Sequence, residues 1–132
     1  MDCLKQCSKE HGGRQLRVEA NWGWMTIDGK RYGGDVVVHV DGSITPRETA
    51  LSLPYRQELF HTPLSEAELG FLEKERPEAV IVAAGHKGML TLTPKAKEIL
   101  SSYDSKVVLT PEAALLASNE RRRFVAFFHL TC

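Results

Sequence analysis

The fold of this chain is decided by the stretch Ala79-Val80-Ile81-Val82-Ala83-Ala84-Gly85-His86-Lys87-Gly88. Its first six residues are all apolar, three of them β-branched, and lack the alternation of a half-buried strand. This pattern predicts a strand over residues 79–84 that is buried on both faces of a sheet. The two glycines that follow predict a turn that takes the chain off the strand. We therefore expect the rest of the chain to be arranged around this strand.

Length and composition favour one globular domain. The chain has 132 residues, of which 42% are hydrophobic and 26% are charged, and these proportions argue against a disordered chain. We expect residues 1–14 to be a flexible N-terminal lead-in and residues 15–132 to form a single α/β domain. The N-terminus lacks a signal-peptide pattern and no apolar run is long enough for a membrane span. We therefore expect a soluble, cytoplasmic protein that does not bind membranes.

Charge and cysteine content exclude several classes of function. Seventeen basic residues balance seventeen acidic ones, and we expect no nucleic-acid binding, because the run Arg121–Arg123 has no accompanying motif and suits the end of a helix. Cys3, Cys7 and His11 are spaced as on one helical face, but three ligands match no common zinc module. We expect no metal and no cofactor. The three cysteines, including Cys132, are interpreted as reduced.

The first third of the chain predicts antiparallel β-structure. Residues 15–20 alternate apolar and polar side chains, as in a half-buried strand. Residues 25–27 and 30–32 flank Asp28-Gly29, a dipeptide typical of two-residue hairpin turns. Another strand is expected over 36–40, followed by a second turn of the same chemistry at Asp41-Gly42.

The middle of the chain is less regular. Three prolines between residues 46 and 63 predict an irregular connection with at most one short strand. Ser65-Glu66-Ala67-Glu68 has the spacing of a capping box, in which Ser65 accepts from the Glu68 amide and the Glu68 side chain reaches back. It predicts a helix over about 66–75 that buries Leu69 and Leu72, weakened by Gly70 and ended by Pro77.

The last third predicts alternating helices and strands. Thr93-Pro94 and Thr110-Pro111 each predict a helix that begins with a threonine cap and a proline in the first turn. We expect the second helix to end near Asn119 in a left-handed cap, with a short buried strand over 106–109 and a final strand over 123–130. Parallel strands joined by helices build a three-layer α/β fold with a central mixed, mostly parallel sheet, to which the N-terminal antiparallel β-structure is added.

Several segments taken in order resemble one family of small single-domain proteins. It includes the vertebrate adipogenesis-associated domain protein, a mitochondrial assembly factor of the first respiratory complex, and many uncharacterised archaeal and bacterial members. The resemblance covers residues 16–132 and rests on Gly23–Tyr32, Asp35–Val38, Arg47–Thr49, Pro77–Gly88, Val107–Thr110 with Ala113, and the tetrapeptide His129-Leu130-Thr131-Cys132.

This resemblance implies a three-layer α/β fold with extra β-structure and no agreed reaction. Members with assigned roles act as assembly or regulatory factors. The chain departs from the family where relatives have a longer helix with a Tyr-Asn pair, because residues 110–123 form a short stretch with Ser118-Asn119 at most a remnant. A role of that helix in relatives therefore does not carry over.

A candidate ligand site follows from the sheet topology. Ligands of such sheets gather beyond the carboxyl ends of the strands, which predicts that the loop Gly85-His86-Lys87-Gly88 lies near Thr110. Exposed amides, Lys87 and Arg47 could hold a small anion, although the loop matches neither a phosphate loop nor a dinucleotide fingerprint. His86 is interpreted as a solvent-facing loop residue rather than a general base, and His129 as a core histidine whose polar atoms are satisfied.

Three functions remain open from the sequence. The first is a non-enzymatic interaction or assembly factor, favoured because the chain shows no nucleophile–base pair, paired carboxylates or metal set. The second is an anion-binding protein or enzyme that uses Gly85–Gly88. The third is a homo-oligomer whose surface carries the role. Trp22 and Trp24 would suit a contact surface for a partner protein or a second copy, or one of them covers the core.

Overall fold

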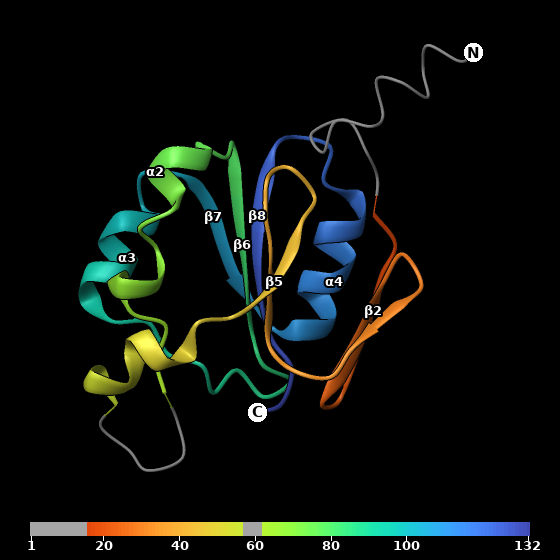
Figure 1. Ribbon diagram of the computed structural model, residues 1–132, viewed down its shortest axis with the longest axis horizontal. Coiled ribbons are helices and arrows are strands. Elements are labelled where there is room, and N and C mark those ends of the chain that lie inside the picture. Colours follow the sequence, from red (N-terminus) through yellow and green to blue (C-terminus); the bar gives the residue numbers. More distant parts are fainter. Residues whose placement is uncertain (1–15, 57–61) are drawn as a thin grey trace.

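The computed structural model describes residues 16–56 and 62–132. Helices α2 (Leu72–Glu75) and α3 (Pro94–Leu100) cover one face of a five-stranded sheet, and α4 (Thr110–Asn119) covers the other (Figure 1). A separate three-stranded sheet packs against the far side of α4 (Figure 1). The expected α/β class, with three layers and added N-terminal β-structure, is confirmed. The predicted lead-in, with Cys3, Cys7 and His11, lies outside the described residues.

The five-stranded sheet is mixed. Its order is β5-β4-β8-β6-β7, formed by Ile44–Pro46, Val36–Val38, Phe124–His129, Ala79–Ala84 and Asp104–Val108. Strand β6 pairs in parallel with β7 on one side and with β8 on the other, whereas β4 pairs antiparallel with β8 and β5. The predicted central strand is therefore confirmed, with the predicted bounds. The two pairs that include β6 are parallel, and the two pairs that include β4 are antiparallel.

Strand β6 is buried along its whole length because both of its faces meet apolar layers. Val80, Val82 and Ala84 join the cluster under α2 and α3. The alternate residues Ala79, Ile81 and Ala83 join the cluster under α4. Successive side chains of a strand point to opposite faces, so an unbroken apolar run is what a strand covered on both sides requires.

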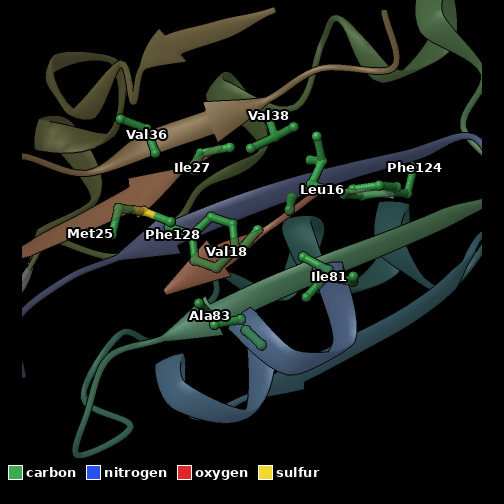
Figure 2. Packing of buried hydrophobic residues seen from close by; sticks show 14 of the residues in the cluster. Leu16, Val18, Met25, Ile27, Val36, Val38, Ile81, Ala83, Phe124 and Phe128 are labelled. Carbon is green, nitrogen blue, oxygen red and sulfur yellow. The ribbon is translucent and has the colours of Figure 1, made fainter. Parts of the chain in front are cut away.

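Helix α4 packs between two sheets. Three buried alanines, Ala113, Ala114 and Ala117, lie in the same cluster as Phe124 and Phe128 of β8 and as Met25 and Ile27 of the N-terminal sheet. Figure 2 shows the phenylalanines, Met25, Ile27 and Ile81 converging on this shared core. Small side chains on α4 let both sheets approach the helix closely, which close-packed interiors demand.

The N-terminal sheet consists of β1 (Val18–Asn21), β2 (Trp24–Ile27) and β3 (Lys30–Tyr32), all antiparallel. Asp28 and Gly29 connect β2 to β3 with φ angles of 52° and 87°. Two successive positive φ angles are the hairpin turn that the Asp-Gly dipeptide favours, so this prediction is confirmed. Strands β4 and β5 form the second predicted hairpin, but β4 ends at Val38 rather than at residue 40, and Asp41-Gly42 lies within a connection over residues 39–43.

The predicted helix over 66–75 is wrong as a single element. The chain forms a 3-10 turn η3 at Glu66–Glu68 and then α2, with Gly70 in the interruption. Leu69 and Leu72 are buried as expected. Ser65 does cap the turn, but it accepts from the Ala67 amide at 3.2 Å. Glu68 does not complete the capping box, because its carboxylate binds Arg47 instead.

Segment 46–63 contains no short strand in its described part. After β5, the chain forms the 3-10 helix η2 at Thr49–Tyr55 with Pro54 inside it. Proline removes one backbone donor but tolerates helical φ angles, so a tight helix is available where a central strand is not. Ser52 is the buried residue of this helix.

Three predictions about the last third need correction. Strand β7 is an edge strand rather than a buried one, with Val107 48% exposed. Thr110 is the first residue of α4 rather than its cap, because its hydroxyl faces the sheet. Asn119 is the last helical residue, and no left-handed cap follows, since Glu120 has a φ angle of −77°.

None of these helices is suited to a bilayer. Across residues 16–56 and 62–132, no helix combines the length and the apolar composition needed to cross a membrane.

The tight fit of α4 predicts a strong effect of enlarging one of its alanines. Ala113→Leu should lower the free energy of unfolding by about 1–3 kcal/mol, because the added carbons have no room between the two sheets. Leu115→Ala is the matched control on the same helix: Leu115 is 66% exposed, so its loss should stay within about 0.5 kcal/mol. Urea denaturation measures both. Equal effects of the two substitutions would contradict this packing.

Candidate functional site

The loop after β6 is tied to Thr110. The Gly85 amide donates to Thr110 Oγ1 at 2.9 Å, and the Thr110 amide donates to the Gly85 carbonyl at 3.1 Å. Thr110 Oγ1 in turn donates to the His129 carbonyl at 2.6 Å. The predicted proximity of loop and threonine is confirmed. Thr110 is fully buried, and its hydrogen bonds join the end of β6 and the start of α4 to the end of β8.

The loop amides have acceptors within the chain. His86 donates its amide to the Thr131 carbonyl at 2.8 Å. Lys87 and Met89 both donate to the backbone oxygen of Cys132, at 2.9 and 3.0 Å. The amides that could cradle an anion are therefore occupied by the segment that follows β8. Of the predicted anion ligands in this loop, the Lys87 side chain remains.

Gly85 makes this closure possible. Its φ angle is +99°, and a Cβ at this position would overlap the carbonyl group of Cys132 and lie 2.9 Å from the His129 ring. Glycine alone avoids both the left-handed backbone strain and the overlap. The close approach of the loop to the segment after β8 therefore depends on Gly85.

One exposed surface forms around this loop, and we call it the Trp22 surface. It consists of Trp22, His86, Lys87, Met89 and Leu109. The Trp22 and His86 rings lie 5.4 Å apart, and Lys87 Nζ lies 6.0 Å from the Trp22 ring centre. Leu109 lies against Gly88. Trp22 is 52% exposed and Met89 43%. The sequence suggested Trp22 and the Gly85–Gly88 loop as separate candidate sites, and the contacts of Trp22 with His86 and Lys87 show that they share one surface.

Trp24 does not share the environment of Trp22. Arg31 Cζ lies 4.2 Å from the centre of the Trp24 ring, on the outer face of the N-terminal hairpin. The two tryptophans therefore have different neighbours, although only Gly23 separates them in sequence.

Arg47 lies in a buried ionic cluster. Its Nε and Nη2 atoms donate to the two carboxylate oxygens of Glu68, both at 2.9 Å. Nη2 also donates to the Pro63 carbonyl at 2.9 Å, and Ser52 donates to Glu68. The side chains of Arg47 and Glu68 are 3% and 2% exposed. The guanidinium charge is thus neutralised inside the protein, by a residue that the sequence had assigned to helix capping.

The cluster continues to His129 through Asp35. Arg47 Nη1 lies 3.4 Å from Asp35 Oδ2, and His129 Nδ1 lies 2.8 Å from the same oxygen. The Leu130 amide donates to the other oxygen at 3.0 Å. Burial alone would raise the pKa of Asp35, but the hydrogen bond and charge of His129, with the Leu130 amide and Arg47, lower this pKa overall. The Nδ1 atom of His129 has a partner, as expected, but His129 is half-buried rather than a core residue.

Sequence reasoning missed Asp35, Glu68, Ser52 and Ser65 as partners. Ser52 and Ser65 hydroxyl oxygens lie 2.7 Å apart beside the Glu68 carboxylate. The one available signal was an arginine at the start of an irregular segment, which needs an acidic partner if it is buried.

A pocket of about 400 Å³ opens above Arg47, and we call it the β5 pocket. Four apolar residues and five polar or charged ones form its lining. The lining residues are Val37, His39, Thr45, Pro46, Arg47, Glu48, Glu68, Phe71 and Phe127. Arg47 and Glu48 both line it.

A substitution at Gly85 tests the closure of the loop. Gly85→Ala should lower the free energy of unfolding by more than about 2 kcal/mol, because left-handed strain and the overlap with Cys132 add together. Gly23→Ala is the matched control, with a φ angle of +83° and no atom within 4 Å of the added Cβ. Denaturation and amide exchange at Lys87 and Met89 report the effect. Equal loss in both variants would show that backbone strain alone matters.

The lowered pKa of Asp35 predicts a pH dependence of stability. A carboxyl whose folded pKa is depressed stabilises the fold above its unfolded pKa of about 3.9, and this contribution is lost as the pH falls through the lower folded pKa. Asp35→Asn should therefore be less stable than the parent chain at pH 6, and the difference should shrink below about pH 4. Urea denaturation at both pH values measures it. A constant difference would rule out the ionised Asp35 as its source.

Comparisons with known proteins place the fold. No profile of a known family matches the sequence, and no curated protein is significantly similar to it. The solved structure of MT938 is 33% identical, with a TM-score of 0.74, over 89% of this chain and 99% of that chain. The conserved hypothetical protein PH1505 from Pyrococcus horikoshii OT3 is 29% identical, with a TM-score of 0.77, over 87% and 98%.

A third structure gives the fold its name. A Bordetella pertussis protein, solved by NMR in solution and described as an Mth938-like domain, is 20% identical with a TM-score of 0.52, over 87% of this chain and 85% of that chain. At this identity the likeness concerns the fold alone. The resemblance to a small family with uncharacterised archaeal and bacterial members is thus confirmed, and the match to nearly all of MT938 shows that this chain belongs to the family of Mth938-like domains.

Proposed function

We propose that this protein is a non-enzymatic interaction domain of the cytoplasm that serves as an assembly or regulatory factor, and that it binds its partner protein through the Trp22 surface. The observation that carries the proposal is the exposed Trp22 ring beside Lys87, whose loop also carries exposed Met89 and lies against exposed Leu109 at Gly88. Tryptophan is enriched among the residues that dominate binding energy at protein interfaces.

The surface is built rigidly enough to serve as an interface. The Gly23 amide donates to the Leu130 carbonyl at 2.8 Å, which fixes the turn that carries Trp22. His86 Nε2 bonds the Asn21 carbonyl at 3.0 Å from the other side. A surface whose backbone is already held in place loses little conformational entropy on binding.

Charge suggests what the partner brings. Within residues 16–56 and 62–132, no carboxylate forms an ion pair with Lys87. A partner segment with an apolar side chain and a nearby carboxylate would cover Trp22 and satisfy Lys87 together. Such charge complementarity adds specificity and speeds association.

An interaction role is favoured over the anion-binding alternative. The amides of Gly85, His86, Lys87 and Met89 already donate within the chain. An anion at this loop would therefore rely on Lys87, without the several amides that anion-binding concavities supply. The resemblance to a family with a mitochondrial assembly factor supports the same choice.

The proposal is tested by comparing the two tryptophans. Affinity-tagged parent chain, Trp22→Ala and Trp24→Ala are purified from the native cells, and bound proteins are quantified by mass spectrometry. Trp22→Ala should reduce a specific partner at least tenfold, since loss of an interface tryptophan costs about 2 kcal/mol or more. Trp24→Ala should retain it, because Trp24 packs with Arg31.

A charge reversal adds a second arm. Lys87→Glu should weaken the same partner, and sedimentation of the purified chain shows whether that partner is a second copy. A partner bound equally by the parent chain, Trp22→Ala and Lys87→Glu would rule out the Trp22 surface. A parent chain that enriches no protein and stays monomeric would rule out the interaction role itself.

A further inference from the structure

The β5 pocket lies apart from the Trp22 surface, and no residue lines both. Val37 and Phe127 form its apolar floor, since both are buried residues of the sheet. Phe71 forms an aromatic wall, with its ring 5.9 Å from Phe127 and 5.0 Å from His39. Its volume of about 400 Å³ falls in the range of small-molecule sites. An apolar body of the size of one aromatic ring suits the side of the pocket that Val37, Phe71 and Phe127 form.

The charges around the pocket are mainly negative. Glu48 and Glu68 line it, Asp35 binds Arg47, and Glu75 binds His39 at 2.7 Å. Among the lining residues and the partners that their side chains bind, Arg47 is the one permanent cation. Its charge is offset by Glu68 and Asp35. The pocket therefore favours a cation over an anion, by simple Coulomb attraction.

Two polar groups at the rim are hydrogen-bond acceptors. The Glu48 side chain is exposed and forms no cap with η2, and the described part of the chain holds no partner for its carboxylate. His39 places Nδ1 against Glu75 and Nε2 2.8 Å from Thr45 Oγ1. A hydroxyl oxygen has two lone pairs, so whichever of these two groups donates, the Thr45 oxygen keeps a lone pair that accepts from a ligand.

From this arrangement we propose that the β5 pocket binds a small primary amine with an apolar, aromatic-sized body. The ring packs on Phe71, Phe127 and Val37, and the ammonium group donates to the Glu48 carboxylate and to Thr45 Oγ1. The sequence suggested that Arg47 binds an anion, whereas the proposed ligand is a cation. The reason is that the buried Glu68 carboxylate already neutralises the Arg47 guanidinium. The site is independent of the proposed partner surface.

The test uses two probes of equal shape and opposite charge. The full chain, labelled with ¹⁵N, is titrated with phenethylamine and separately with 3-phenylpropionate at pH 7.5, and amide shifts are followed by NMR. Phenethylamine should give saturable shifts centred on Thr45, Glu48 and Phe71, with a Kd on the order of 1 mM for so small a ligand. The carboxylate should bind at least tenfold more weakly.

Variants assign the interaction to the pocket. Glu48→Gln should weaken phenethylamine binding about fivefold or more and reduce its salt dependence, because the carboxylate is lost while the shape is kept. Glu112→Gln, an exposed carboxylate of α4, should leave the affinity unchanged.

Several results would overturn the proposal. They are equal or tighter binding of 3-phenylpropionate, no saturable shift near the pocket up to about 20 mM phenethylamine, or unchanged affinity in Glu48→Gln. Trp22→Ala should bind phenethylamine like the parent chain, so failure of this pocket and failure of the partner surface are distinguishable.

Discussion

The structure depends on the need to cover both faces of β6. Its six residues are apolar on either side, so a layer must bury each face. Leu72, Ala96 and Leu100 of α2 and α3 supply one layer. The buried alanines of α4 supply the layer on the other face of β6. Helix α4 also has an apolar side that faces away from β6 and must be covered in turn. The N-terminal hairpin sheet is the element that covers this second side, through Val18, Met25 and Ile27.

A buried ionic cluster holds the less regular half of the molecule. The segment from 46 to 68 has little regular structure in its described part, yet Arg47, Ser52, Ser65 and Glu68 converge in it. Two buried charges are costly to desolvate unless they are paired and hydrogen-bonded, and here the guanidinium fork meets both carboxylate oxygens. The cluster therefore fixes η2 and η3 against β4 and β5 where an apolar core alone would leave their register open.

The sequence was sufficient where local patterns determine structure. The apolar run gave β6 its bounds, Asp28-Gly29 gave the hairpin, and Thr93 capped α3 by accepting from the Ala96 amide at 3.2 Å. It was insufficient where a residue chooses between a local and a distant partner. Glu68 has the spacing of a capping box in the sequence but binds Arg47 in the structure, because a carboxylate buried to 2% exposure requires a cation more than a backbone amide.

The candidate site shows the same limit. Proximity of the Gly85–Gly88 loop to Thr110 followed from the rule for parallel strands, and it was correct. The sequence did not predict that Cys132 accepts from the loop amides. No local pattern shows which part of the fold the segment after a final strand contacts. The position of β7 at an edge was equally hidden, since strand order is set by tertiary packing rather than by the composition of Lys106–Leu109.

One chain of buried contacts joins the two surfaces. From the β5 pocket, Arg47 bonds Asp35, Asp35 bonds His129, and the His129 carbonyl accepts from Thr110, which holds Gly85 beneath the Trp22 surface. Each contact is made by a group that is wholly or largely buried, where hydrogen bonds are strong and their loss is costly. Asp35 is the residue of this series that contacts both Arg47 at the pocket and His129, whose carbonyl accepts from Thr110.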